Sequence, residues 1–235
     1  MDFESGEILY FNKPYTWTSF RLVGRIRWII SKAFGIKKLK VGHAGALDPL
    51  ATGVMIICTG KATKKIESFQ YQTKEYIATL QLGATTPSFD MEHEVDQTFP
   101  YEHITKEMIN EVLPQFIGEI MQTPPLFSAV KIDGKRAYKY ARNGETVNLK
   151  SKPLVIDEIE VLNFDLPKLE LRIVCSKGTY IRALARDIGT ALNSGAYLTA
   201  LKRTKIGNVT LNDCLNIEDF EEKYKTQNSQ EQDNS

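Results

Sequence analysis

Some segments of the chain have apolar residues in continuous or alternating runs, and others have them at helical spacing. The first pattern indicates strands and the second indicates helices. Apolar or strictly alternating runs predict short strands at residues 7–11, 54–58, 74–83, 153–164, 168–175 and 205–211. Apolar residues at helical spacing predict helices at residues 19–34, 105–116, 181–192 and 217–224, and a further helix starts at Gly60. Residues 84–103 lack either pattern and predict mostly loop. This alternation of strands and helices is compatible with an α/β protein.

The first predicted helix, residues 19–34, has two chemically different faces. Thr18 or Ser19 can cap its amino end, and Gly35 is expected to end it. One face is apolar and consists of Leu22, Ile26, Ile29, Ile30 and Ala33. The opposite face carries Arg21, Arg25, Trp28 and Lys32. A basic face with an indole ring can follow a phosphate backbone, but a solvated helix face has the same composition.

Charge is balanced overall but distributed unevenly. The 235 residues are 42% hydrophobic and 25% charged, which is ordinary for a soluble globular protein of one large or two small domains. The net charge is +1, yet residues 8–47 contain eight Lys or Arg and no acid. Residues 131–152 are also mostly basic, whereas residues 90–111 and the carboxyl-terminal tail are mostly acidic. This asymmetry favours a face that binds a polyanion.

Several classes of function lack their patterns in this sequence. The three cysteines are far apart and the three histidines show no ligand spacing, so neither a zinc site nor a disulfide framework is expected. The residues around Gly60-Lys61 do not have the spacing of a nucleotide-binding phosphate loop. The chain shows no signal sequence and no apolar run of membrane-spanning length, so we expect a cytoplasmic protein.

The glycine-rich stretch GHAGALDPLATG at residues 42–53 has the composition of a shaped loop that presents a carboxylate. Asp48 is the first acidic residue after Glu7, and Pro49 disfavours a helical conformation at Asp48. The glycines allow positive φ angles or the close approach of a ligand. Taken alone, an ordinary Asp-Pro turn is the simpler explanation of this stretch.

Residues 124–150 predict a projecting hairpin or flap. Residues that break helices and strands lie on both sides of the segment. Within it, basic residues are interleaved with aromatic residues, and the basic residues include Lys131, Arg136 and Arg142. This mixture suits phosphate pairing and base stacking, although the tyrosines could also pack a short helix onto the body of the protein.

The segment 176–182 leads into a helix that carries Arg182 and Arg186 one turn apart on its polar side. A helix start with an arginine in its first turn is a suitable anion site. Alternatively, Arg182 can pair with a carboxylate from elsewhere and hold it ionised and positioned, and Asp48 is the obvious candidate. Tyr76 lies near the start of strand 74–83, at the rim of a core or within it.

Five motifs follow one another between about residues 7 and 215. They are GHAGALDPLATG at 42–53, KEY at 74–76, QTPP with SAVK at 122–131, KGTYIR at 177–182 and LKRT at 201–204. Their sequences and spacing resemble the TruB family, the bacterial tRNA pseudouridine-55 synthases. The resemblance implies isomerisation of a flipped-out uridine in the T loop of tRNA. It also implies the α/β pseudouridine synthase fold, a mixed and largely antiparallel sheet flanked by helices with an inserted RNA-binding flap.

The resemblance also implies which residues are catalytic. Asp48 is expected to be the nucleophile and Arg182 its partner. Tyr76 is expected to stack on the target base and to help with the proton at C5. Neither a metal nor a cofactor is implied. Whether the aspartate attacks the sugar carbon or C6 of the base, or deprotonates the sugar, stays open.

Further contacts with the RNA are implied in the same way. Tyr180 and Leu201 match residues that line the base pocket, and His43 matches a residue that contacts RNA near the extruded bases. The backbone of the tRNA T arm is expected to lie against the first helix and the flap, through Arg21, Arg25, Lys131, Arg136 and Arg142.

The expected organisation is one catalytic domain, residues 1–215, followed by a helix and a polar, disordered tail at residues 216–235. Many family members carry an additional RNA-binding domain of the PUA type, and this chain ends soon after the catalytic motifs. The missing domain weighs against a synthase that depends on a guide RNA. We expect a monomer that acts on tRNA. A non-catalytic tRNA-binding module is the main rival, and the complete set of Asp48, Tyr76 and Arg182 argues against it.

Overall fold

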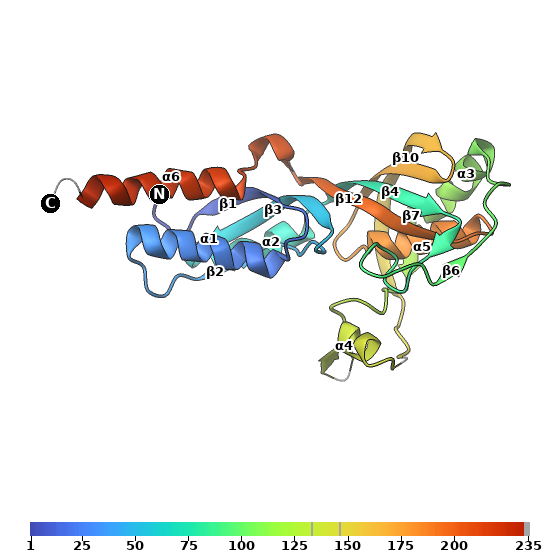
Figure 1. The fold of residues 1–235 in the computed structure, drawn as a ribbon, viewed down its shortest axis with the longest axis horizontal. Helices are drawn as coiled ribbons and strands as arrows, with labels where there is room; N and C mark the ends of the chain where they lie inside the picture. The colour runs from blue at the N-terminus through green and yellow to red at the C-terminus, as the bar shows by residue number, and fades with distance from the viewer. Residues whose placement is uncertain (133, 146, 233–235) are drawn as a thin grey trace. The chain divides into compact units, whose positions relative to one another are not determined.

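The computed structural model describes residues 1–132, 134–145 and 147–232 (Figure 1). The chain forms two compact units: unit 1 consists of residues 1–74 together with the segment from residue 202 onward, and unit 2 consists of residues 75–201. Strand β12 (Ala196–Ile206) contributes to both units, because the chain returns to unit 1 after Leu201. Among the described residues, no helix combines the length and apolar composition that crossing a bilayer requires.

The sheet of unit 1 is built around one buried strand. Strand β3 (Ala51–Thr59) lies between β1 (Ile8–Lys13) and the last residues of β12, and β2 (Val41–His43) also pairs with it. β1 and β3 are antiparallel, with Ile8 opposite Cys58 and Lys13 opposite Gly53. Every β3 residue from Gly53 to Thr59 is buried, which confirms the strand predicted from the apolar run.

Helix α1 (Ser19–Phe34) packs its apolar face into unit 1 as predicted. The Thr18 side chain accepts a hydrogen bond from the Arg21 N–H, and Gly35 ends the helix with a φ of 66°. The buried residues of this helix are Ser19, Leu22, Val23, Ile26, Ile29 and Ile30. Helix α6 (Ile217–Gln232) lies against α1 and is joined to it by an ion pair between Arg25 and Glu221. Among the described residues of unit 1, the remaining helical segments are Gly60–Lys65, α2 (Ile66–Tyr71) and Leu211–Asp213.

Unit 2 contains a sheet whose strand order is β12, β4, β11, β10 and β7. The bounds of these strands are β4 (Lys74–Leu82), β7 (Gly118–Gln122), β10 (Lys152–Asp165) and β11 (Lys168–Cys175). β10 pairs antiparallel with both β11 and β7. Alternate residues of β4 are buried, among them Tyr76, Ala78, Leu80 and Leu82, as expected for the alternating run predicted at residues 74–83.

Two helices of unit 2 were predicted within a few residues. α5 (Ile181–Ala191) begins after Tyr180, and α3 (Lys106–Val112) begins at Thr105, whose side chain accepts the Met108 N–H. The last turn of the predicted helix 105–116 is the 3₁₀ segment Leu113–Phe116. The segment 84–103 contains only the two-residue strands β5 (Ala84–Thr85) and β6 (Gln97–Thr98), so it is mostly loop as expected.

The predicted flap at residues 124–150 contains a short hairpin and one helix. Strands β8 (Lys131–Ile132) and β9 (Lys135–Arg136) pair antiparallel, and α4 (Ala137–Arg142) follows directly. This segment stands away from the rest of unit 2 (Figure 1). A projecting segment of this kind agrees with the prediction made from its flanking breakers.

The carboxyl-terminal part differs from the prediction in two places. The run 205–211 is not one strand, because the chain turns at Gly207, with a φ of 55°, between β12 and β13 (Val209–Thr210). Helix α6 continues past Tyr224 to Gln232. Glu, Gln and Lys favour a helix even where no apolar residues recur at helical spacing. A prediction based on apolar spacing alone therefore ended the helix too early. The disordered tail predicted directly after Tyr224 is therefore wrong for residues 225–232, which are helical. The rest of the predicted tail, after Gln232, lies outside the described residues.

Candidate active site

Asp48 lies in the loop that joins β2 to β3, as the glycine-rich stretch predicted. Its backbone carbonyl accepts a hydrogen bond from the Ala51 N–H at 3.1 Å, so Asp48 begins a tight turn. Gly45 and Gly53 on either side have φ angles of 121° and 111°, which residues with a Cβ rarely adopt. The Asp48 side chain is half-buried. The loop is therefore a defined structure with a partly exposed carboxylate.

Arg203 of β12 fixes one side of this loop from inside unit 1. Its guanidinium donates to the carbonyl oxygens of Val54 at 2.8 Å, Ala46 at 3.3 Å and Gly45 at 3.1 Å. The residue is only 2% exposed. A Cβ at Gly53 would clash with the Arg203 backbone, so this glycine also allows β12 to approach the loop. Sequence reasoning missed Arg203, although it lies within the LKRT motif.

Lys13 and Ser19 fix the other side of the loop. The Lys13 side chain is fully buried, because it continues the inward-facing positions of β1, and its Nζ donates to the carbonyls of Pro14, Trp17 and Pro49. Burial lowers the pKa of Lys13 to about 8, although the nearby charge of Asp48 opposes this shift. The Ser19 hydroxyl donates to the Leu47 carbonyl at 2.9 Å and accepts the Leu47 N–H at 2.8 Å.

His43 lies at the start of the same loop. Its Nδ1 accepts the Gly45 N–H at 3.3 Å, and burial together with the charge of Arg203 lowers the pKa of the imidazole. A neutral ring that accepts at Nδ1 carries its proton on Nε2. His43 therefore offers a hydrogen-bond donor beside the Asp48 loop.

Arg182 is the centre of a second network, which lies within unit 2. The sequence placed it on the polar side of a helix, but its side chain is buried and the residue is 5% exposed. Its guanidinium donates to the carbonyls of Ser88 and Phe127, each at 2.9 Å, and its Nε lies 3.6 Å from Asp90 Oδ2. Buried arginines require such partners, so the environment holds the guanidinium in one orientation.

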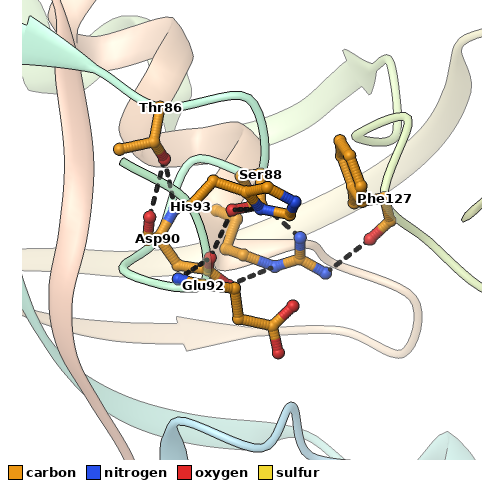
Figure 2. A network of polar contacts seen from close by, with 7 residues as sticks. Thr86, Ser88, Asp90, Glu92, His93 and Phe127 are labelled. Atoms are coloured by element: carbon orange, nitrogen blue, oxygen red, sulfur yellow. Dashed lines mark hydrogen bonds and ion pairs between the residues drawn. The ribbon is translucent and has the colours of Figure 1, made fainter. Parts of the chain in front are cut away.

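Asp90 is a further charged residue at this site, and sequence reasoning missed it. Its carboxylate accepts hydrogen bonds from the Ser88 hydroxyl at 2.5 Å and the Glu92 N–H at 3.0 Å. The Thr86 hydroxyl donates to the Asp90 carbonyl and accepts the Asp90 N–H (Figure 2). Asp90 belongs to an acidic segment that was predicted to be mostly loop, yet it is 5% exposed. The turn-forming residues directly before it were the only local signal.

The aromatic candidates also lie in unit 2. Tyr76 is 8% exposed on β4. Tyr180 precedes α5, and the buried Gln122 side chain binds its backbone twice: Oε1 accepts the Tyr180 N–H at 2.9 Å, and Nε2 donates to the Tyr180 carbonyl at 3.2 Å. Leu201 is half-buried at the end of the unit 2 part of β12. Because Asp48 belongs to unit 1 and Arg182 to unit 2, their pairing stays a prediction.

The residues expected to contact the RNA backbone differ in their surroundings. Arg21 is exposed and lies over the Trp17 ring at 4.1 Å, whereas Arg25 is bound through two nitrogens to Glu221. On the flap, Lys131, Arg136 and Arg142 are exposed, and Arg142 lies 5.3 Å from the Tyr138 ring. Arg25 therefore has its charge compensated, while Arg21 and the three flap residues are exposed to solvent.

Two family models match the chain. The model described as "TruB family pseudouridylate synthase (N terminal domain)" matches residues 31–181. The model described as "tRNA pseudouridylate synthase B C-terminal domain" matches residues 182–234. Together the two models account for most of the chain, in agreement with the motifs found in the sequence.

Relatives with curated names agree with these models. A protein of Phocaeicola vulgatus is 68% identical over 222 residues, with 94% of each chain covered. A protein of Parabacteroides distasonis is 65% identical over 222 residues, again with 94% of each chain covered. Both are named tRNA pseudouridine synthase B.

Solved structures share the fold. A chain of a Cbf5–Nop10–Gar1 complex matches with a TM-score of 0.69 and 28% identity, over 94% of this chain and 55% of that chain. A chain of an H/ACA RNP bound to a substrate RNA containing 2′-deoxyuridine matches with a TM-score of 0.67 and 25% identity, over 94% and 54%. The chain thus spans about half the length of these solved chains. The likeness confirms the fold that the motifs implied.

Proposed function

Because the chain belongs to the TruB family of pseudouridylate synthases, it is an isomerase that converts uridine in tRNA to pseudouridine, and we propose that its target is uridine 55 of the T loop. The observation that carries this assignment is the likeness to proteins named tRNA pseudouridine synthase B, at 68% and 65% identity over 94% of the chain. In the reaction the bond between the ribose C1′ and N1 breaks, and C1′ is joined to C5 instead. The proton on C5 leaves, and N1 gains one.

Asp48 is the proposed nucleophile, and the construction of its loop supports this role. Covalent catalysis needs a carboxylate that is held in place and can reach the substrate. Arg203 and Lys13 bind the loop backbone from the protein interior, while the Asp48 side chain stays partly exposed. The backbone is thus fixed by neighbours other than Asp48 itself.

Arg182 is the proposed partner of Asp48, and Asp90 is the residue that orients it. The two carbonyls and one carboxylate around the guanidinium restrict its rotation. A preorganised cation stabilises negative charge on a catalytic carboxylate without reorganising during the reaction. Tyr76 is proposed to stack on the flipped base and to help remove the C5 proton. Tyr180 and Leu201 are proposed to line the base pocket.

The target base must leave its stack before any side chain can reach C1′ or C5. We propose that His43 contacts the RNA beside the vacated position, using the donor on Nε2. Phosphates of the T arm are proposed to bind at α1 and the flap through Arg21, Lys131, Arg136 and Arg142, with Arg25 contributing less because Glu221 already binds it. We further propose that the enzyme acts in the cytoplasm as a monomer and without a guide RNA. Its relatives named tRNA pseudouridine synthase B support tRNA as the substrate.

The test uses purified protein and unmodified tRNA labelled with tritium at C5 of uridine. Isomerisation releases this tritium to water, so release measures turnover directly. We expect Asp48→Asn to abolish release while filter binding of tRNA stays close to wild type, since the amide keeps the shape of the loop but is not nucleophilic. Tritium release by Asp48→Asn near the wild-type rate would refute the assignment of the nucleophile.

A further inference from the structure

His93 contacts the Arg182 network but has no part in the roles described above. Its Nδ1 lies 2.9 Å from the Ser88 hydroxyl oxygen. Its ring lies against the Phe127 ring, with centroids 4.4 Å apart and an interplanar angle of 50°. The side chain is half-buried, and Figure 2 shows it between Ser88 and Phe127. His93 therefore touches two of the residues whose carbonyls bind Arg182.

The direction of the hydrogen bond between His93 and Ser88 follows from counting protons. A serine hydroxyl has one proton, and the 2.5 Å distance from Ser88 Oγ to Asp90 Oδ1 is that of an O–H bound to a carboxylate. The proton of Ser88 is thus committed to Asp90. At 2.9 Å, His93 Nδ1 must then donate to the lone pair of Ser88 Oγ. The imidazole accordingly carries a proton on Nδ1.

This chain of donors has a direct consequence for Arg182. His93 fixes the Ser88 hydroxyl, and the Ser88 hydroxyl fixes the Asp90 carboxylate that faces Arg182 Nε. The His93 ring also packs on Phe127, whose carbonyl accepts from Arg182 Nη2. The Asp90 carboxylate and the Phe127 carbonyl, which both bind the guanidinium, therefore depend on one imidazole. Hydrogen bonds in such a connected network support one another.

We propose that His93 is a positioning residue for Arg182, acting through Ser88 and Asp90 and through Phe127. The proposal rests on the role assigned to Arg182 in the proposed function. Without the Nδ1 donor, the Ser88 hydroxyl rotates more freely and the Asp90 carboxylate is less firmly placed. Arg182 then spends less time in the orientation that the transition state requires, so kcat falls. KM for tRNA stays close to wild type, because the role proposed for His93 acts through Ser88 and Phe127 within the protein.

The test compares His93→Leu with His93→Asn. Leucine fills the space but donates nothing, whereas the asparagine amide places an N–H near the position of Nδ1. We expect His93→Leu to lower kcat about tenfold, the size of one lost hydrogen bond, with KM within about twofold. His93→Asn should recover most of this loss. His103→Asn is the matched control, because His103 also donates a single hydrogen bond, from Nε2 to the Leu192 carbonyl at 2.9 Å, and should leave kcat unchanged.

Two further measurements separate positioning from a general effect on folding. In a Ser88→Ala background, His93→Leu should cause little additional loss of kcat, because the connection to Asp90 is already broken. Nitrogen-15 spectra of the imidazole should show a proton on Nδ1. Unchanged kcat in His93→Leu, an equal loss in His93→Asn, full additivity with Ser88→Ala, or a bare Nδ1 would each overturn the proposal.

A parallel variant distinguishes failure of this inference from failure of the proposed function. If Arg182→Lys turns over normally, the role of Arg182 is wrong and the inference is overturned with it. If Arg182→Lys is slow while His93→Leu is normal, only the inference about His93 is wrong.

Discussion

The Asp48 loop depends on Arg203, and Arg203→Lys tests this dependence most sharply. The guanidinium donates to three backbone carbonyls, of Val54, Ala46 and Gly45, from a position that is 2% exposed. A lysine ammonium is a compact donor on a flexible stem and cannot reproduce the flat fork that reaches all three. The substitution keeps the charge, so any effect reports the lost geometry.

The expected magnitude follows from the number of bonds lost. If the ammonium retains one carbonyl, two hydrogen bonds from a charged donor are lost, at about 1.5–3 kcal/mol each. The free energy of unfolding should therefore fall by about 3–6 kcal/mol, or the loop should open locally by the same free energy. Relative to wild type this disfavours the ordered loop by a factor of about 10² to 10⁴. We expect turnover to fall at least about tenfold as Asp48 loses its fixed position.

Urea unfolding and tritium release measure the two consequences in the same protein preparation. Arg172→Lys is the matched control, because Arg172 binds Glu75, Glu158 and Glu160 on a more exposed surface of unit 2. Exposed ion pairs contribute about 0–1 kcal/mol, so this control should stay close to wild type in both assays. Arg203→Lys could instead unfold with a free energy within about 0.5 kcal/mol of wild type and turn over normally. That result would show that Arg203 does not hold the loop.

Three further outcomes follow from the structure. Burial lowers the pKa of Lys13 from 10.5 to about 8, so between these pH values the folded protein binds fewer protons than the unfolded chain and its unfolding free energy rises with pH. Lys13→Met should lack this rise, and parallel pH curves for the two proteins in urea unfolding would contradict the argument. Arg182→Lys should lower kcat by at least about tenfold, because a point charge replaces a guanidinium that binds two carbonyls and a carboxylate; a normal kcat in tritium release would contradict it. Arg21→Ala should reduce the slope of log Kd for tRNA against log salt by about one, and an unchanged slope would remove Arg21 from the RNA interface.

Local patterns predicted the elements whose signals lie within a few residues of one another. Helix α1 is an example, since Thr18, the apolar spacing and Gly35 are all read within one short segment. The loop around Asp48 is another, because its glycines permit the positive φ angles that the loop adopts and Pro49 restricts the backbone of Asp48. In both cases the signals that predict the element lie within the segment itself, although the Asp48 loop also depends on the distant Arg203 to hold its backbone.

Residues whose role depends on distant partners escaped prediction. Arg203 binds the carbonyl of Gly45, which lies 158 positions away, and no periodicity connects the two. Asp90 is acidic within an acidic segment, and only its burial beside Arg182 distinguishes it from its neighbours. Lys13 lies beyond the predicted strand 7–11, but β1 continues to Lys13 and turns its side chain inward. Burial of a charged side chain is a property of the folded chain, so the roles of these three residues could not be predicted from local sequence patterns.

The most direct test of the central claim maps pseudouridine in a complete unmodified tRNA after incubation with the purified protein. We predict that wild-type protein produces pseudouridine at position 55 of the T loop and that Asp48→Asn produces none there. Modification only at other positions, or modification of position 55 by Asp48→Asn at the wild-type rate, would contradict the account.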